Sequence, residues 1–156
     1  MSPATKTAAP DEIYDVKTFQ PGTSVGYLVN RVRADLLAAM DRELEPFDVT
    51  SAQYIIMGHL VYNLASSASG LCKGIAYDPG AMTRMIDRLE AKGLIRRVRS
   101  EDDRRAVVLE LTDEGRAVFP KMRVKVVGVL NHLMRGFSKA EARQLESLLQ
   151  RMVANA

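Results

Sequence analysis

The chain has 156 residues, 47% of them apolar and 26% charged, which is enough for one globular domain with a sizeable core. Its 22 basic and 19 acidic side chains leave a formal net charge of +3, which does not by itself separate an enzyme from a binding protein. No apolar run reaches the roughly 18 residues of a membrane span, no secretory signal pattern is present and Cys72 is alone, so we expect a cytoplasmic protein with neither a disulfide nor a membrane partner.

The first part of the chain predicts a tail followed by two helices. Residues 1–24 are expected to form a flexible tail and an irregular lead-in, because their first half is rich in Ala, Thr and Pro. From 25 to 44 apolar residues recur at helical spacing, and Pro46 ends that helix. The stretch Thr50-Ser-Ala-Gln53 has the pattern of a capping box, which predicts a second helix that continues to about Leu64.

A short helix near 71–76 and a longer one after it are predicted next. Asp78-Pro79 places an N-cap residue and a helix-starting proline at the beginning of the longer helix. The helix runs to Lys92, and Gly93 supplies the stop. Its inward stripe consists of Met82, Met85, Ile86 and Leu89.

A basic hairpin is predicted over residues 94–111. Two strands, 94–99 and 105–111, are joined by a turn at 100–104. The segment RRVRSEDDRR at 96–105 holds five arginines and three acids, a charge excess that fits a nucleic-acid contact. A solvated turn whose charges pair with one another is the alternative.

Two helices complete the chain. Thr112 opens a long one that ends before Gly136, and Ser138-Lys-Ala-Glu141 is a second capping box that opens the last helix. The last helix carries an apolar face that is either intramolecular core or half of a dimer interface. Its members are Leu145, Leu148, Leu149 and Met152.

This order of elements predicts a winged helix-turn-helix, a mainly α fold with a small β-hairpin (α+β). An α-helix fits the DNA major groove, so the outward side of the 79–92 helix becomes a candidate DNA-reading surface. Small residues at its beginning allow close approach, Thr83 suits a phosphate or a thymine methyl, and Arg84 suits phosphate or guanine. The helix N-terminus also attracts phosphate. The alternative is a solvent-facing helix on which Asp87 neutralises one arginine. The outward residues are Gly80, Ala81, Thr83, Arg84, Asp87 and Arg88.

Two segments resemble the MarR family of bacterial transcriptional regulators. Residues 78–97 read DPGAMTRMIDRLEAKGLIRR, and residues 103–115 read DRRAVVLELTDEG. The second segment matches the family's wing pattern D-x-R-x-x-x-L-x-L-T-x-x-G, and the flanking helices extend the resemblance over nearly all of 25–154.

The resemblance implies a homodimeric repressor that reads a near-palindromic operator in double-stranded DNA. Residues 25–49 and 113–156 would be dimerisation helices, and residues 50–112 the DNA-binding region. Carried over by position, Thr83 and Arg84 would contact the major groove and Arg88 the backbone. In the wing, Arg105 would enter the minor groove, Asp103 would orient the wing and Arg104 would contact a phosphate.

Similar regulators often release DNA when a small aromatic acid or phenol enters the cleft beside the DNA-binding region. An arginine beside aromatic residues would suit an aromatic carboxylate, although each candidate alone fits an ordinary core or surface position better. The candidates on the first two helices are Tyr27, Asn30, Arg31, Tyr54, Met57, His59 and Tyr62.

The sequence predicts no catalytic site, no metal site and no cofactor. His59 and His132 are far apart and lack a neighbouring nucleophile or a metal-ligand spacing, and no glycine-rich phosphate loop is present. Cys72 lies away from the N-terminal position of peroxide-sensing relatives and is interpreted as a buried thiol. The alternative to a DNA reader is a ligand-binding or protein-interaction module with the same fold.

Overall fold

The computed structural model describes residues 12–100 and 107–155, which divide into two compact units that meet at Asp35 and Leu36. The first unit holds a 3-10 turn, Pro21–Thr23, and the beginning of α1, Val25–Leu44, with the bounds expected from the sequence. In the lead-in, the rings of Tyr14 and Phe19 meet edge to face at 5.5 Å between centroids.

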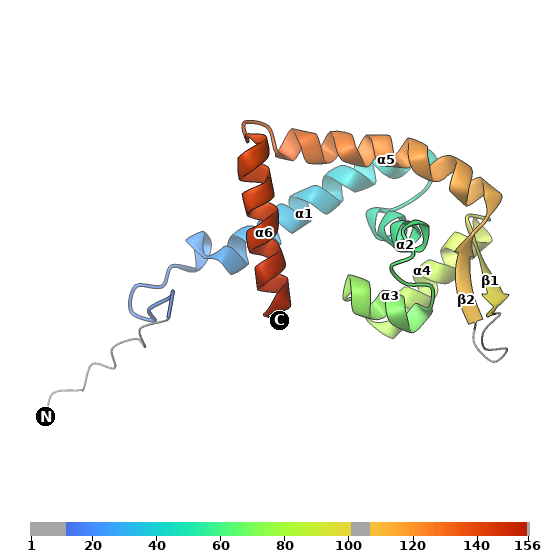
Figure 1. Cartoon of the computed structure of the whole chain (residues 1–156), viewed down its shortest axis with the longest axis horizontal. Coiled ribbons are helices and arrows are strands. Elements are labelled where there is room, and N and C mark those ends of the chain that lie inside the picture. Colours follow the sequence, from blue (N-terminus) through green and yellow to red (C-terminus); the bar gives the residue numbers. More distant parts are fainter. Residues whose placement is uncertain (1–11, 101–106, 156) are drawn as a thin grey trace, which may run out of the picture. The chain divides into compact units, whose positions relative to one another are not determined.

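The second unit begins its helix-turn-helix with α2, Ser51–Val61, and α3, Ala68–Ile75 (Figure 1). The capping box at Thr50 is confirmed, but α2 ends earlier than predicted because Asn63 adopts a left-handed backbone with φ of 52°. Conversely, α3 begins earlier than predicted because the Ser67 hydroxyl accepts a hydrogen bond from the Gly70 N–H.

The third helix of this region, α4, spans Pro79–Ala91 and begins and ends as expected. Oδ1 of Asp78 accepts a hydrogen bond from the Ala81 N–H at 2.9 Å, and Gly93 has a φ of +69° that favours glycine. Met82, Ile86 and Leu89 are buried, while Met85 is half-buried. The predicted inward stripe is therefore confirmed.

The hairpin consists of β1, Ile95–Arg99, and β2, Val107–Leu111, paired antiparallel. At its base Ile95 faces Leu111, and both are buried. Towards the turn Arg99 faces Val107, and both are exposed. The hairpin is thus held by its base against the rest of the unit.

Two helices follow the hairpin, α5 (Asp113–Leu133) and α6 (Lys139–Ala154). The capping box of Ser138 and Glu141 at the start of α6 is confirmed. The Thr112 hydroxyl joins the hairpin to α5, since it donates to the Gly93 carbonyl at 2.5 Å and accepts from the Gly115 N–H at 3.0 Å.

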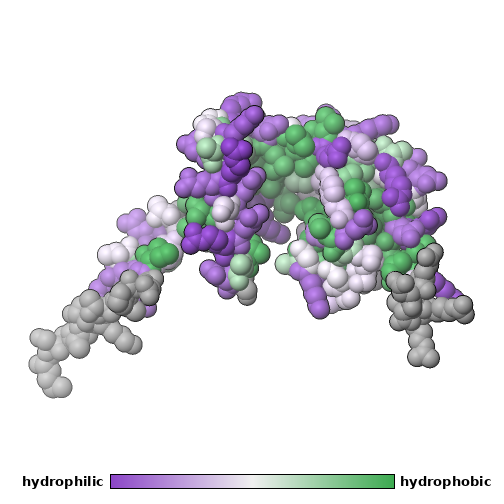
Figure 2. All heavy atoms as spheres, viewed as in Figure 1, coloured by the Kyte–Doolittle hydropathy of each residue, from purple (hydrophilic) through white to green (hydrophobic). Residues whose placement is uncertain are grey.

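The core of the second unit is apolar and lies where α2, α4, the hairpin base and α5 meet. Figure 2 shows hydrophobic atoms gathered below α5 and hydrophilic ones on the outside of this region. A mainly α fold with a small hairpin wing is confirmed. Among the described residues no helix is long and apolar enough to cross a membrane. The largest fully buried side chains are Leu44, Ile56, Met57, Leu71, Met82, Ile86, Leu89, Ile95 and Met122.

Candidate nucleic-acid interface

The outward side of α4 presents a stripe that consists of a glycine in the first turn and two arginines in the turns that follow. Gly80, Arg84 and Arg88 follow one another at four-residue spacing, so they share one face, and all three are exposed. A methyl group at Gly80 would come 3.5 Å from Nη1 of Arg84. The Arg84 side chain therefore runs back over Gly80 towards the beginning of the helix, where the backbone is least covered.

Polar groups at the beginning of α4 already have partners within the helix. The Thr83 hydroxyl donates to the Pro79 carbonyl at 2.9 Å, which leaves its methyl group and oxygen lone pairs for another contact. The Asp78 carboxylate occupies the helix N-terminus, so its negative charge opposes a phosphate there. Ala81 is half-buried, while Thr83 is exposed.

The acid on this helix, Asp87, pairs with the hairpin rather than with Arg84 or Arg88. Its Oδ1 lies 2.5 Å from Nη2 of Arg97 in β1, and the hydrogen bond raises the pKa of the Arg97 guanidinium. Within residues 12–100 and 107–155, Arg84 and Arg88 have no ion pair. The alternative in which Asp87 neutralises one of them is therefore wrong.

Arg99 extends the basic surface along the hairpin. Its exposed guanidinium has no ion pair in the part of the chain that the structure describes, whereas Nη2 of Arg96 lies 3.0 Å from Oε2 of Glu110. The wing residues Asp103, Arg104 and Arg105 lie outside the described residues, so their predicted roles stay predictions.

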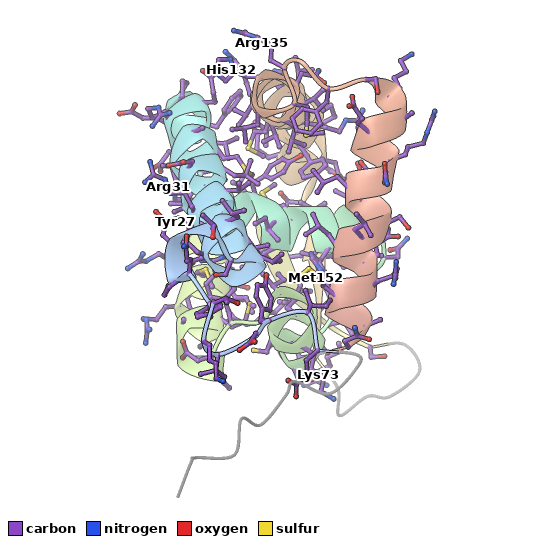
Figure 3. All side chains as sticks on the ribbon, turned by 90° about the vertical axis from the view of Figure 1, so that its left-hand side faces the viewer. Tyr27, Arg31, Lys73, His132, Arg135 and Met152 are labelled. Atoms are coloured by element: carbon purple, nitrogen blue, oxygen red, sulfur yellow. The ribbon has the colours of Figure 1, made fainter. Side chains whose placement is uncertain are left out.

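One exposed cation on α3, Lys73, was not singled out from the sequence. It projects from the last turn of the helix that precedes α4 (Figure 3). A single lysine in a short helix with weak periodicity carries no signal of its own. Cys72 beside it is a free thiol that packs against the core, although it is half-buried rather than buried as expected.

An aromatic cluster joins α2 to α5. The rings of Tyr54 and Phe119 stack at 5.0 Å with an interplanar angle of 6°, and Tyr62 meets Phe119 edge to face at 6.3 Å. Nη1 of Arg123 donates to the Tyr62 hydroxyl at 3.5 Å. Burial, and to a lesser extent Tyr62, raise the pKa of the Tyr54 phenol. Arg123 was not predicted as a site residue because it lies 61 positions from Tyr62.

The other effector candidates lie in different units: Met57 and His59 in the second unit, and Tyr27, Asn30 and Arg31 in the first. Met57 is fully buried in the core, and Nδ1 of the half-buried His59 lies 3.0 Å from the Ile55 carbonyl oxygen. In the first unit Tyr27 and Arg31 project from one side of α1 (Figure 3), and both are exposed, as is Asn30. As ligand-binding residues, all seven candidates stay predictions.

Arg31 already has a carboxylate partner. Its Nε lies 3.0 Å from Oδ2 of Asp35, one helical turn further along α1, and this hydrogen bond raises the pKa of the Arg31 guanidinium. Within the described residues Arg123 has no such acidic partner. Arg123 is therefore the freer cation for an anionic ligand.

The apolar face of α6 is exposed within one chain. Figure 3 shows Met152 on this helix, and no residue of α6 is buried. The four predicted interface residues are between 37% and 46% exposed, so they are not intramolecular core. Exposed apolar residues continue on α5 and after it, at Val127, Leu130, Leu133 and Phe137.

No group of three or more His, Cys, Asp or Glu side chains that could hold a metal ion occurs among the described residues. His59 lies in α2, and His132 lies at the far end of α5 beside Arg135 (Figure 3). The second unit instead presents a basic surface, made of the exposed Arg84, Arg88 and Arg99.

Comparison with known proteins identifies relatives. A family model described as MarR family matches residues 47–106. The multiple antibiotic resistance protein MarR of Escherichia coli is 30% identical over 131 residues, which cover 83% of this chain and 90% of that protein. The uncharacterized HTH-type transcriptional regulator YhbI of Bacillus subtilis is 34% identical over 105 residues, 67% of this chain and 66% of that regulator.

Two solved structures are similar over most of the chain. One is a MarR variant from E. coli complexed with operator DNA, with a TM-score of 0.73, 29% identity, and coverage of 82% of this chain and 92% of that one. The other concerns the regulation of DNA binding of Bordetella bronchiseptica BpsR by 6-hydroxynicotinic acid. Its TM-score is 0.77 at 26% identity, with coverage of 86% and 96%.

Proposed function

Because the chain belongs to the MarR family of transcriptional regulators, we propose that it is a cytoplasmic, dimeric repressor that reads a palindromic operator and is released by a small aromatic acid or phenol. The observation that carries the proposal is the exposed stripe of Gly80, Arg84 and Arg88 on α4. Both arginines lack an ion pair within the described residues, and a basic hairpin follows directly.

The proposed DNA contacts divide between α4 and the wing. Arg84 reads guanine or a phosphate in the major groove, Arg88 binds the backbone, and the Thr83 methyl contacts thymine. In the wing, Arg105 enters the minor groove, Asp103 orients it and Arg104 binds a phosphate. Two copies of the chain would place two such surfaces on half-sites about one helical turn apart.

Replacing Arg84 and Arg105 with alanine tests this reading of DNA. The probe is a duplex that the wild-type protein selects from a randomised pool. Each substitution is expected to weaken binding by about 10- to 100-fold, because a good base or groove contact contributes about 1–3 kcal/mol. The logarithm of the binding constant should also fall less steeply with the logarithm of the salt concentration, because each lost arginine–phosphate contact reduces that slope.

Arg143→Ala is the matched control, since it removes the same charge from an exposed position on α6, outside the proposed DNA surface. It should change the affinity little. If Arg84→Ala and Arg105→Ala bind as tightly as wild type, with the same salt dependence, the chain is not a DNA reader of this kind. A ligand-binding or protein-interaction module then becomes the better account.

For the effector, the aromatic cluster of α2 and α5 supports a site for an aromatic acid. Tyr54, Phe119 and Tyr62 offer ring contacts, and Arg123 lies at the edge beside the Tyr62 hydroxyl. A guanidinium without a carboxylate partner can pair with a ligand carboxylate in two parallel hydrogen bonds. We therefore add Arg123 to the candidates and propose it in place of Arg31 as the carboxylate partner.

Arg123→Ala is expected to weaken the response to aromatic acids by about tenfold or more, because hydrogen bonds between charged groups contribute about 1.5–3 kcal/mol. The measurement is the rise in thermal midpoint and the release of the selected duplex, titrated with benzoate and nicotinate derivatives that include 6-hydroxynicotinic acid. Arg116→Ala, at another exposed position on α5, is the control. An unchanged titration of Arg123→Ala would exclude Arg123 from the effector site.

A further inference from the structure

One arginine of the hairpin, Arg97, contacts two acids of α4 at once. Its Nη2 lies 2.5 Å from Oδ1 of Asp87, and its Nη1 pairs with Oε2 of Glu90. The Arg97 backbone N–H also donates to Oε1 of Glu90 at 3.2 Å. Asp87 and Glu90 are three residues apart, so they lie on one face of the helix. We call this set the Arg97 clamp.

The Arg97 clamp lies at the middle one of the five residue pairs that join β1 and β2. Arg97 is paired across the sheet with Leu109, whose N–H donates to the Ser66 carbonyl at 2.7 Å. At this level β1 is tied to α4 and β2 to the loop before α3. Beyond it Val98 and Val108 are half-buried, and Arg99 and Val107 are exposed, so the clamp is placed to set the direction in which the two strands leave α4.

The clamp contributes more to geometry than to stability. The side chains of Arg97, Asp87 and Glu90 are 36%, 56% and 37% exposed, and exposed ion pairs contribute little to folding. However, a planar guanidinium that binds two carboxylates and is fixed at its own backbone allows few orientations. A two-stranded hairpin has little rigidity of its own, so such a contact can fix the direction of its strands relative to α4.

We propose that Arg97 is a positioning residue that holds the hairpin at a fixed angle to α4, so that the two elements must engage one DNA duplex together. This proposal rests on the proposed reading of DNA. The consequence is sequence specificity. With a hairpin held at a fixed angle, the affinity depends on the base pairs at the flank of each half-site, whereas with a loose hairpin the affinity does not depend on them. The clamp also neutralises two acids that would otherwise repel phosphate beside Arg84 and Arg88.

The test removes either the arginine or the two acids of the clamp, so that the two variants change the net charge in opposite directions. Arg97→Gln removes one positive charge, and the double variant Asp87→Ala/Glu90→Ala removes two negative charges. The affinity of each 156-residue variant is measured for two duplexes. The first is the duplex that the wild type selects from a pool randomised over about 30 base pairs, and the second is the same duplex with its flanking sequences exchanged. The wild type is expected to lose about tenfold in affinity on the flank exchange.

Both clamp variants are expected to lose less than about twofold on the flank exchange. Arg96→Gln is the matched control, because it removes the same charge one residue away. The Arg96 side chain contacts Glu110 in β2 and not α4. This control should keep the wild-type discrimination. Thermal midpoints of all variants should lie within a few degrees of wild type. Arg97→Lys keeps the charge and one ion pair, and it should discriminate to an intermediate degree.

Clamp variants that keep the tenfold flank discrimination overturn the proposal, whatever happens to their overall affinity. If discrimination follows net charge, so that Arg97→Gln matches Arg96→Gln and the double variant differs from both, the role is electrostatic and the positioning role is wrong. If the wild-type protein selects no duplex at all, the proposed function fails, which is seen before any variant is made.

Discussion

Replacing Gly115 with alanine is expected to destabilise the protein by about 3 kcal/mol, because no space exists for a side chain where α5 begins. A methyl group there would collide with the carbonyl oxygen of Leu94 and come 2.8 Å from Cδ2 of Leu111. The Leu94 carbonyl cannot move away freely, since it accepts a hydrogen bond from the Thr112 N–H at 3.1 Å. The added methyl must push the base of the hairpin away from α5.

Urea unfolding followed by circular dichroism measures this effect. Gly128→Ala is the matched control, because it is the same substitution in the same helix with nothing within 4 Å of the added methyl group. This control should stabilise the protein by up to about 1 kcal/mol, the difference in helix propensity. A Gly115→Ala protein that unfolds at the wild-type urea concentration would show that the junction between the hairpin and α5 yields easily.

Replacing Leu148 and Leu149 with glutamate is expected to separate the proposed dimer and to abolish tight operator binding. The two side chains are 46% and 38% exposed in one chain and lie with Leu145 and Met152 on one face of α6. Burying a leucine contributes about 1.5–3 kcal/mol, and a buried carboxylate without a partner costs more still. The dimer dissociation constant should therefore rise by at least about 100-fold.

Sedimentation of the purified variants measures the oligomeric state, and DNA binding to the wild-type-selected duplex measures the consequence. Ser147→Glu is the control, because it adds one glutamate charge on the opposite face of the same helix. It should leave the dimer intact. A dimer that survives both leucine substitutions would place the interface on another surface, such as the exposed apolar residues of α5.

The sequence by itself determined the order of the elements and the starts of four helices, because each of these starts depends on residues that are neighbours in the chain. At Thr50, Asp78, Thr112 and Ser138 a side-chain oxygen accepts from a backbone N–H three residues later, so four residues contain the whole interaction. The same holds for the inward stripe of α4, which follows from helical spacing alone. The end of α2 was predicted too late, although its signal is local, since Asn63 tolerates the left-handed backbone better than most residues do.

The partners of the charged side chains were decided only by the tertiary structure. From the sequence, one alternative placed Asp87 beside Arg84 or Arg88 on its own helix, but Asp87 pairs with Arg97 in the next element. Similarly, Arg123 contacts Tyr62 across 61 positions, and Gly115 is required because the Leu94 carbonyl approaches it. A charge or a glycine in a sequence does not indicate which distant group will approach it, because that depends on how the hairpin and α5 pack against the core.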